Sequence, residues 1–166
     1  MKEELVKHWV KNERNRPIFK LDRLAPANHI EHTNAHDAMA DVRATIGIAR
    51  IIKDTQPKFF NYALSLNDKK EVAQLVKPLH PMLLTSSSFG YKSSFTRLVT
   101  SICNHPEYND RSIVFNLNQD PEIFLELESE ELKTLTFSKK SDLPKGIEKL
   151  DLSELVYNKS PMFVCS

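Results

Sequence analysis

The spacing of hydrophobic residues changes from helical to alternating about halfway along the chain. A helix is predicted over residues 35–53, because apolar residues recur there every three or four positions, at Ala38, Val42, Ile46, Ala49 and Ile52. Asn34 can cap this helix, with Asp37 three residues later in the manner of a capping box. The helix should end before Pro57, because the residue that precedes a proline resists helical geometry.

The rest of the chain predicts shorter elements of both kinds. Two short helices are expected at 57–66 and 68–76, and a third at 129–137, where Ser129 is the expected cap. Residues rich in β-branched and aromatic side chains predict strands at 82–86, 95–102 and 112–117, with one or two more within 147–164. Helices therefore precede strands, which favours an α+β fold with a division near residue 56 or 76.

The first 30 residues carry weaker signals. Residues 1–16 are polar and predict a short helix or a frayed arm. The alternation in residues 18–24 favours a strand or an extended connector, and Pro26 and the Asn-His pair at 28–29 are expected to mark the turn that follows.

The composition is that of an ordinary globular chain. Hydrophobic residues make up 40% and charged residues 27% of the 166 positions, and 23 basic residues nearly balance 22 acidic ones. No apolar run approaches the roughly 20 residues that a membrane span needs, and the N-terminus lacks the apolar block of a secretory signal. The 2 cysteines are too few for a disulfide framework, so a reducing cytoplasm is the expected location.

Charge is unevenly distributed along this balanced chain. Residues 72–106 contain no acidic residue, and their cations alternate with aromatic residues, among them Tyr91, Lys92, Phe95 and Arg97. Such a surface suits single-stranded nucleic acid, whose bases stack on rings and whose phosphates attract cations. The same pattern also fits a strand with its aromatic side chains in the core and its cations in water.

A cluster of histidines and aspartates surrounds the start of the predicted 35–53 helix. Three kinds of site are compatible with it. His29, His32 and His36 could bind zinc, although the His-Glu-x-x-His metalloprotease motif is absent. Asp37 and Asp41 lie four residues apart and could hold magnesium against a phosphate. His36 could instead act as a general base beside a metal bound by Asp41, which would activate water for phosphodiester hydrolysis.

A longer pattern connects this cluster with a known family. The segment HTNAHDAMADVRAT, residues 32–45, strongly resembles the third exonuclease motif of bacterial exonuclease I, a DEDD exonuclease with histidine in its last motif. FKLDRLAPANHIEH precedes it, and QPKFFNY, SSFG, the HPE of His105-Pro106-Glu107 and LELESEEL follow in the family's order. The resemblance covers roughly residues 17–163.

The resemblance implies an activity and its residues. Exonucleases of this family remove nucleotides from the 3′ end of single-stranded DNA with two magnesium ions, in repair and recombination. By resemblance, His36 is the general base and Asp41 is one of the metal ligands. Asp37 is not a signature acid of the family, so we leave it a capping role. Single-stranded DNA and a single-strand-binding protein are the implied partners, and Tyr91, Lys92, Phe95 and Arg97 remain pattern-based candidates for DNA contact.

The resemblance also implies the domain organisation. Residues 1–56 would be the C-terminal end of a ribonuclease-H-like exonuclease domain, and residues 57–166 a small antiparallel Src-homology-3-like barrel, truncated at its C-terminus. The family's Asp-x-Glu pair and middle aspartate do not precede His36 in the expected form. Because two metals about 4 Å apart need several carboxylates, we expect a fragment that is inactive alone. The alternative is a non-catalytic module that binds single strands or a partner protein.

Overall fold

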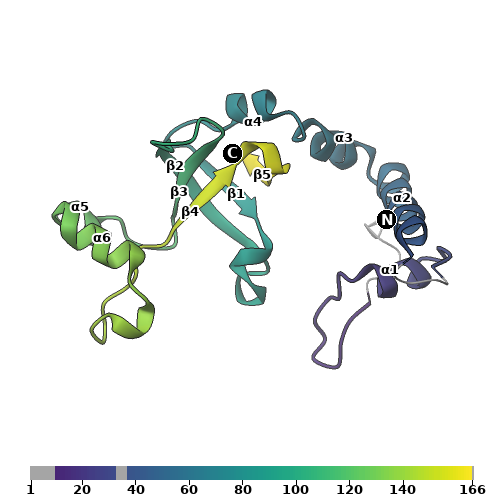
Figure 1. Cartoon of the computed structure of the whole chain (residues 1–166), viewed down its shortest axis with the longest axis horizontal. Helices are drawn as coiled ribbons and strands as arrows, with labels where there is room; N and C mark the ends of the chain where they lie inside the picture. The colour runs from purple at the N-terminus through teal and green to yellow at the C-terminus, as the bar shows by residue number, and fades with distance from the viewer. Residues whose placement is uncertain (1–9, 33–36, 166) are drawn as a thin grey trace, which may run out of the picture. The chain divides into compact units, whose positions relative to one another are not determined.

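The computed structural model describes residues 10–32 and 37–165. Its contacts divide the chain into two compact units, one ending at Tyr62 and the other beginning at Ala63. Figure 1 shows the elements of both units, which we describe separately. No helix in the described ranges is long and apolar enough to cross a membrane.

The first unit is built on two helices that pack through small residues. Helix α1 spans Leu21–Ala27 and helix α2 spans Ala38–Thr55. Ala25 of α1 and Ala44 of α2 are fully buried. A short helix, α3 (Pro57–Ser65), follows α2 and contains the point at which the first unit ends and the second begins.

The structure corrects one expectation for the N-terminal segment. Residues 18–24 do not form a strand, because α1 begins at Leu21 and includes Pro26. The helix forms because contact with α2 buries Ala25, and local alternation cannot reveal such a contact. The expected turn is confirmed at Asn28 and His29, where the His29 amide donates to the Pro26 carbonyl at 3.0 Å.

Residues 1–9 lie outside the described residues, so the helix or frayed arm expected over 1–16 stays a prediction there. In residues 10–16 the chain forms a hairpin, which an antiparallel bridge between Lys11 and Pro17 closes.

The predicted central helix is confirmed, with a later start. The expected capping box, with Asn34 as the cap and Asp37 three residues into the helix, is wrong, because Asp37 itself is the N-cap of α2. Its side chain makes no capping hydrogen bond. The expected cap Asn34 lies outside the described residues. The helix ends at Thr55, as Pro57 requires. Val42 and Ile46 of its apolar face are exposed, because the described part of this unit contains no sheet to cover them.

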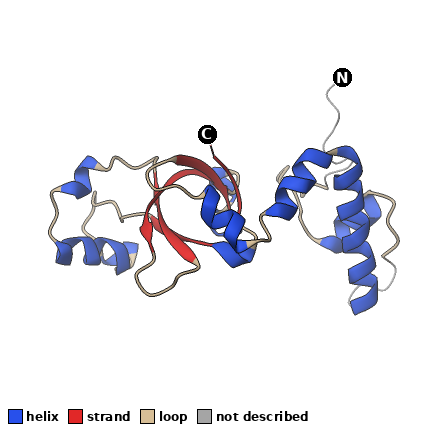
Figure 2. Cartoon of the chain, turned by 90° about the horizontal axis from the view of Figure 1, so that it is seen from above, coloured by secondary structure: helices blue, strands red, loops and turns tan. Residues whose placement is uncertain are grey.

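The second unit is a five-stranded antiparallel sheet preceded by helix α4 (Lys69–Leu75). The strands are β1 (Pro81–Thr85), β2 (Thr96–Asn104), β3 (Arg111–Asn116), β4 (Leu152–Val156) and β5 (Met162–Cys165). Their order is β4-β3-β2-β1-β5, so the last strand returns to pair with the first. Figure 2 shows the strong curvature that makes the sheet barrel-like. The predicted α+β fold is confirmed.

The alternating pattern explains why these strands form. Along β1, buried and exposed residues alternate, with Met82 and Leu84 facing the core. Val99, Val114, Leu155 and Phe163 from the other strands complete this core, and each is at most 2% exposed. The period of two places one set of side chains inside and the other outside.

A helical insertion separates β3 from β4. It contains α5 (Glu122–Leu125) and α6 (Ser129–Phe137), which Figure 1 shows at the far end of the sheet from β5. Phe115, Phe124 and Leu150 form a small core beneath them. Helix α6 has the predicted bounds, but the predicted cap Ser129 is wrong. Glu128 is the N-cap, and it forms a capping box with Glu131.

Candidate functional site

The described part of the histidine and aspartate cluster contains one close pair. His32 Nε2 lies 2.7 Å from Asp41 Oδ1. The His32 side chain is 3% exposed, whereas that of Asp41, on the first turn of α2, is 46% exposed. This hydrogen bond holds one carboxylate oxygen in place while the group as a whole still reaches solvent. His36 lies outside the described residues, so its predicted role stays a prediction.

The described residues do not complete a divalent-metal site by themselves. Over residues 10–32 and 37–165, no three His, Cys, Asp or Glu side chains lie close enough to hold one ion. Magnesium demands near-octahedral oxygen coordination, and Asp41 offers a single carboxylate. Asp37, the other half of the proposed carboxylate pair, is the exposed N-cap residue of α2. His29 and His32 likewise do not belong to a zinc-binding group in the described ranges.

The connection between β1 and β2 carries three of the four candidate DNA-contact residues. It contains two short 3₁₀ turns, Ser87–Phe89 and Tyr91–Ser93, on either side of Gly90. Lys92 and Tyr91 are exposed at this connection. The rings of Tyr91 and Phe95 meet edge to face, with 6.1 Å between their centroids. The connection therefore presents one cation and one aromatic face to solvent.

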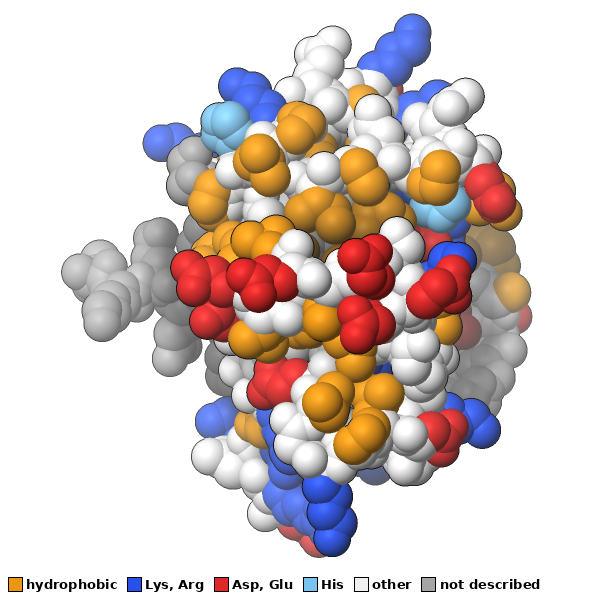
Figure 3. Space-filling view, turned by 90° about the vertical axis from the view of Figure 1, so that its left-hand side faces the viewer, with side chains coloured by type: hydrophobic (Ala, Val, Ile, Leu, Met, Phe, Trp, Pro, Cys, Tyr) orange, Lys and Arg blue, Asp and Glu red, His pale blue; other side chains and the backbone are white. Residues whose placement is uncertain are grey.

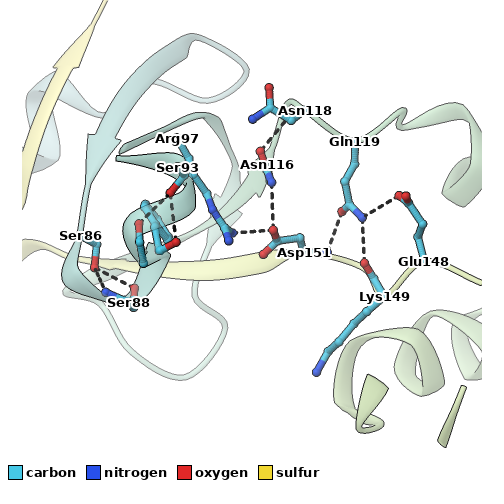
Figure 4. Close-up of polar contacts among 12 residues, drawn as sticks. Ser86, Ser88, Ser93, Arg97, Asn116, Asn118, Gln119, Glu148, Lys149 and Asp151 are labelled. Atoms are coloured by element: carbon cyan, nitrogen blue, oxygen red, sulfur yellow. Dashed lines mark hydrogen bonds and ion pairs between the residues drawn. The ribbon is translucent and has the colours of Figure 1, made fainter. Parts of the chain in front are cut away.

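Backbone and side-chain hydrogen bonds hold this connection in shape. The Ser86 amide donates to the Phe95 carbonyl at 2.8 Å, and the Phe95 amide donates to the Gly90 carbonyl at 3.0 Å. Ser93 Oγ donates to the Phe89 carbonyl, as Figure 4 shows. Ser94 and Phe95 both adopt positive φ. These bonds fix a backbone that side-chain preference alone would disfavour.

Arg97, the fourth candidate, is engaged within the protein. Its Nη1 donates to Asp151 Oδ2 at 2.5 Å, and its guanidinium lies 4.6 Å from the centre of the Phe89 ring. Asn116 Nδ2 donates to the same aspartate oxygen at 2.9 Å, so β2 and β3 both anchor the residue that precedes β4 (Figure 4). The Arg97 side chain is 24% exposed. Its position is that of a structural ion pair.

The structure also reveals a cation that the sequence pattern missed. A pocket of about 380 Å³ separates the β1–β2 connection from the 3₁₀ turn Tyr157–Lys159, and its lining includes Ser86, Ser88 and Lys159. Lys159 lies 67 positions after Lys92 in the sequence, outside the acid-free stretch. Only the return of β5 to β1 brings this turn near the connection.

The HPE motif forms the turn between β2 and β3. The Glu107 amide donates to His105 Nδ1 at 3.1 Å, which closes the turn. Beyond it, Arg111 contacts Asp110, Glu154 and the Tyr108 ring. Hydrogen bonds to Glu154 and Asp110 raise the pKa of Arg111, so this cation is neutralised locally. The motif is therefore a structural corner of the sheet.

Known sequences resemble this chain over most of its length. A family profile described as the exonuclease I SH3-like domain matches residues 67–166. The exodeoxyribonuclease I of Escherichia coli K12 is 38% identical over 138 residues, which cover 82% of this chain and 29% of that protein. The Haemophilus influenzae enzyme is 35% identical over 158 residues, which cover 93% of this chain and 33% of that one. The chain thus spans about a third of the length of these relatives.

Solved structures agree in fold. An E. coli exonuclease I in complex with a dA16 oligonucleotide matches 96% of this chain and 35% of its own, with a TM-score of 0.84 and 33% identity. An ExoI/SSB-Ct complex matches with a TM-score of 0.81 at 31% identity and the same coverage of both chains. A zinc-ion-bound E. coli ExoI–ssDNA complex matches with a TM-score of 0.82 at 32% identity, and it also covers 96% of this chain and 35% of its own.

Proposed function

The chain belongs to the exonuclease I SH3-like domain family, and we propose that it is part of a metal-dependent exodeoxyribonuclease that removes nucleotides from the 3′ end of single-stranded DNA. The observation that carries this proposal is the match of 96% of the chain to an exonuclease I bound to a dA16 oligonucleotide. The match includes the first unit, which supports a ribonuclease-H-like origin for residues 1–56. A reducing cytoplasm suits the two free cysteines, Cys103 and Cys165.

Three residues of the third motif have proposed roles in the chemistry. His36 would accept the proton of the attacking water, and Asp41 would offer a carboxylate oxygen to one of two magnesium ions. The bound ions would lower the pKa of the water and stabilise the charge that develops on the phosphate. His32, which hydrogen-bonds Asp41 Oδ1, would orient that carboxylate. Because the described residues supply one carboxylate at this place, the remaining ligands must come from outside them.

The second unit would contact the DNA and a partner. Lys92 and Tyr91 are exposed on the β1–β2 connection, and Lys159 lies across the adjoining pocket. A cation and a ring so placed suit a phosphate and a stacked base. The similarity to an ExoI/SSB-Ct complex supports a single-strand-binding protein as a second partner.

A chimera tests the proposal. This chain would replace the matching third of E. coli exodeoxyribonuclease I, and a 5′-labelled single-stranded oligonucleotide with magnesium would report cleavage. We expect progressive shortening from the 3′ end. His36→Ala and Asp41→Asn should each lower the rate by about 10² or more, because each removes a group used in the chemical step. Asp54→Asn, an exposed acid at the other end of α2, is the matched control.

Two outcomes would contradict the proposal. A chimera that folds, binds the oligonucleotide and leaves the label intact would favour a non-catalytic binding module. A chimera in which Asp41→Asn cleaves as fast as the Asp54→Asn control would remove Asp41 from the metal site. The isolated chain, assayed in parallel, should bind without cleaving.

A further inference from the structure

An open apolar groove lies in the second unit, away from the β1–β2 connection. One wall is formed by Ile102 and Leu152 of the sheet and by Leu79, which precedes β1, and the other is the helical insertion. Helix α6 turns Leu132 and Phe137 toward this space. The groove has a volume of about 840 Å³, within the range of sites that bind ligands or peptide side chains. We call it the α6 groove.

The apolar residues of the α6 groove are unusually exposed. Leu79 is 75%, Leu125 77% and Phe137 81% exposed, and Ile102 is 42% exposed. Single exposed hydrophobic residues are common, but four in one groove form a contiguous patch of the kind that marks an interaction site.

A ridge of acidic residues borders the α6 groove. Residues 120–131 contain six acidic residues and no basic one. The members on α5, the following turn and the start of α6 are all exposed; we call them the acidic ridge: Glu122, Glu126, Glu128, Glu130 and Glu131. Figure 3, which views the side that carries α5 and α6, shows a row of acidic side chains with hydrophobic ones on both sides of it.

Only part of this negative charge is used within the protein. Glu128 and Glu131 cap α6, and Glu130 lies 2.6 Å from Lys133 Nζ. Within the described ranges, neither Glu122 nor Glu126 forms an ion pair. Among the residues that the structure describes, the one charged residue that lines the groove is Lys133, and its charge is compensated by Glu130. The groove therefore combines an apolar lining with uncompensated negative charge on the neighbouring residues Glu122 and Glu126.

This combination selects the class of partner. Phosphates would be repelled by the acidic ridge, so nucleic acid does not suit the α6 groove. A helix with apolar residues at positions i, i+3, i+4 and i+7 and with Lys or Arg beside them suits both features. Helix α6 has nine residues and is therefore about 13 Å long, which matches two to three turns of such a helix. We propose that the α6 groove binds a basic amphipathic helix of a partner protein.

A model peptide tests this proposal on the full chain. The probe is a fluorescent 14-residue peptide of leucine and lysine with helical spacing, and the control is the same peptide with glutamate in place of lysine. We expect saturable binding of the lysine peptide, which weakens as salt is raised, and none of the glutamate peptide. Amide chemical-shift changes should map to the walls of the α6 groove.

Variants separate the apolar and the ionic contributions. The double variant Leu125→Ser/Phe137→Ser should weaken binding about tenfold or more, because it removes the most exposed anchors. Leu64→Ser, an exposed leucine on α3, is the matched control and should leave affinity unchanged. Glu122→Gln/Glu126→Gln should weaken binding about threefold and reduce its salt dependence.

Three results would overturn the proposal. One is equal binding of the lysine and glutamate peptides. Another is a single-stranded oligonucleotide that shifts the amides of the α6 groove and competes with the peptide. The third is concentration-dependent self-association of the chain that Leu125→Ser/Phe137→Ser abolishes, because the occupant would then be a second copy. None of these readouts depends on nuclease activity, so they are distinct from a failure of the proposed function.

Discussion

At the scale of single residues, burial assigns different tasks to the two cations of the candidate DNA surface. Lys92 is exposed on the β1–β2 connection, whereas Arg97 is paired with Asp151 and lies over Phe89. Removing one partner of a partly buried ion pair leaves the other unsatisfied, which costs more than the pair itself contributes. Substitution of an exposed lysine leaves no partly buried partner unsatisfied.

We therefore predict opposite effects for two matched substitutions. Arg97→Gln should lower the free energy of unfolding by about 1–3 kcal/mol, measured by urea denaturation. Lys92→Gln should change the free energy of unfolding by less than about 0.5 kcal/mol. It should nevertheless weaken single-stranded DNA binding, and the slope of the logarithm of the binding constant against the logarithm of salt concentration should fall in magnitude by about 1. Lys69→Gln, at the exposed start of α4, is the control for general charge effects. If Arg97→Gln lowers DNA affinity and leaves stability unchanged, Arg97 contacts DNA rather than stabilising the fold.

At the scale of elements, periodic segments could be predicted and short or non-local ones could not. The bounds of α6 agree with the sequence prediction, and those of α3, α4 and β1 to β3 lie within a residue or two, because each repeats its pattern over several turns or pleats. Helix α1 was missed because its seven residues carry an alternating pattern, and only contact with α2 decides between helix and strand. Helix α5, at four residues, is too short to show any period.

The β1–β2 connection makes a sharp prediction at this scale. Gly90 has φ 70° and ψ 176°, a conformation that is essentially restricted to glycine, although open space surrounds the position of a Cβ atom. Gly90→Ala should therefore lower the free energy of unfolding by about 1–3 kcal/mol through backbone strain alone. Ser87→Ala, in the adjoining turn, should have a much smaller effect. An unchanged denaturation midpoint for Gly90→Ala would show that the connection adopts another backbone in solution.

At the scale of the whole molecule, the two units differ in how much apolar surface they bury. The described part of the first unit contributes two fully buried hydrophobic residues, Ala25 and Ala44, and leaves Val42 and Ile46 exposed. The second unit buries larger side chains from all five strands. Because burial of apolar area is the main stabilising term, the first unit should open more easily.

Hydrogen exchange measures this difference directly. Amides in the middle of α2 should exchange at least about tenfold faster than those of β2 and β3. The measurement is made under conditions where reclosing is faster than chemical exchange, so that the exchange rate reports the free energy of local opening. Addition of the N-terminal part of an exonuclease I should slow exchange in α2 and leave the sheet unchanged. Uniformly slow exchange across residues 38–55 of the isolated chain would contradict the assigned weakness of this unit.

The sequence by itself determined the family and the main elements, because motif residues and hydrophobic periods are local properties that can be read in order. It placed Asp41 on the first turn of a helix and proposed its chemistry. Only the tertiary structure decided which side chains meet. His32 reaches Asp41 across nine positions and Arg97 reaches Asp151 across 54. Such pairs depend on which helices pack and which strands join, and no local period encodes that choice.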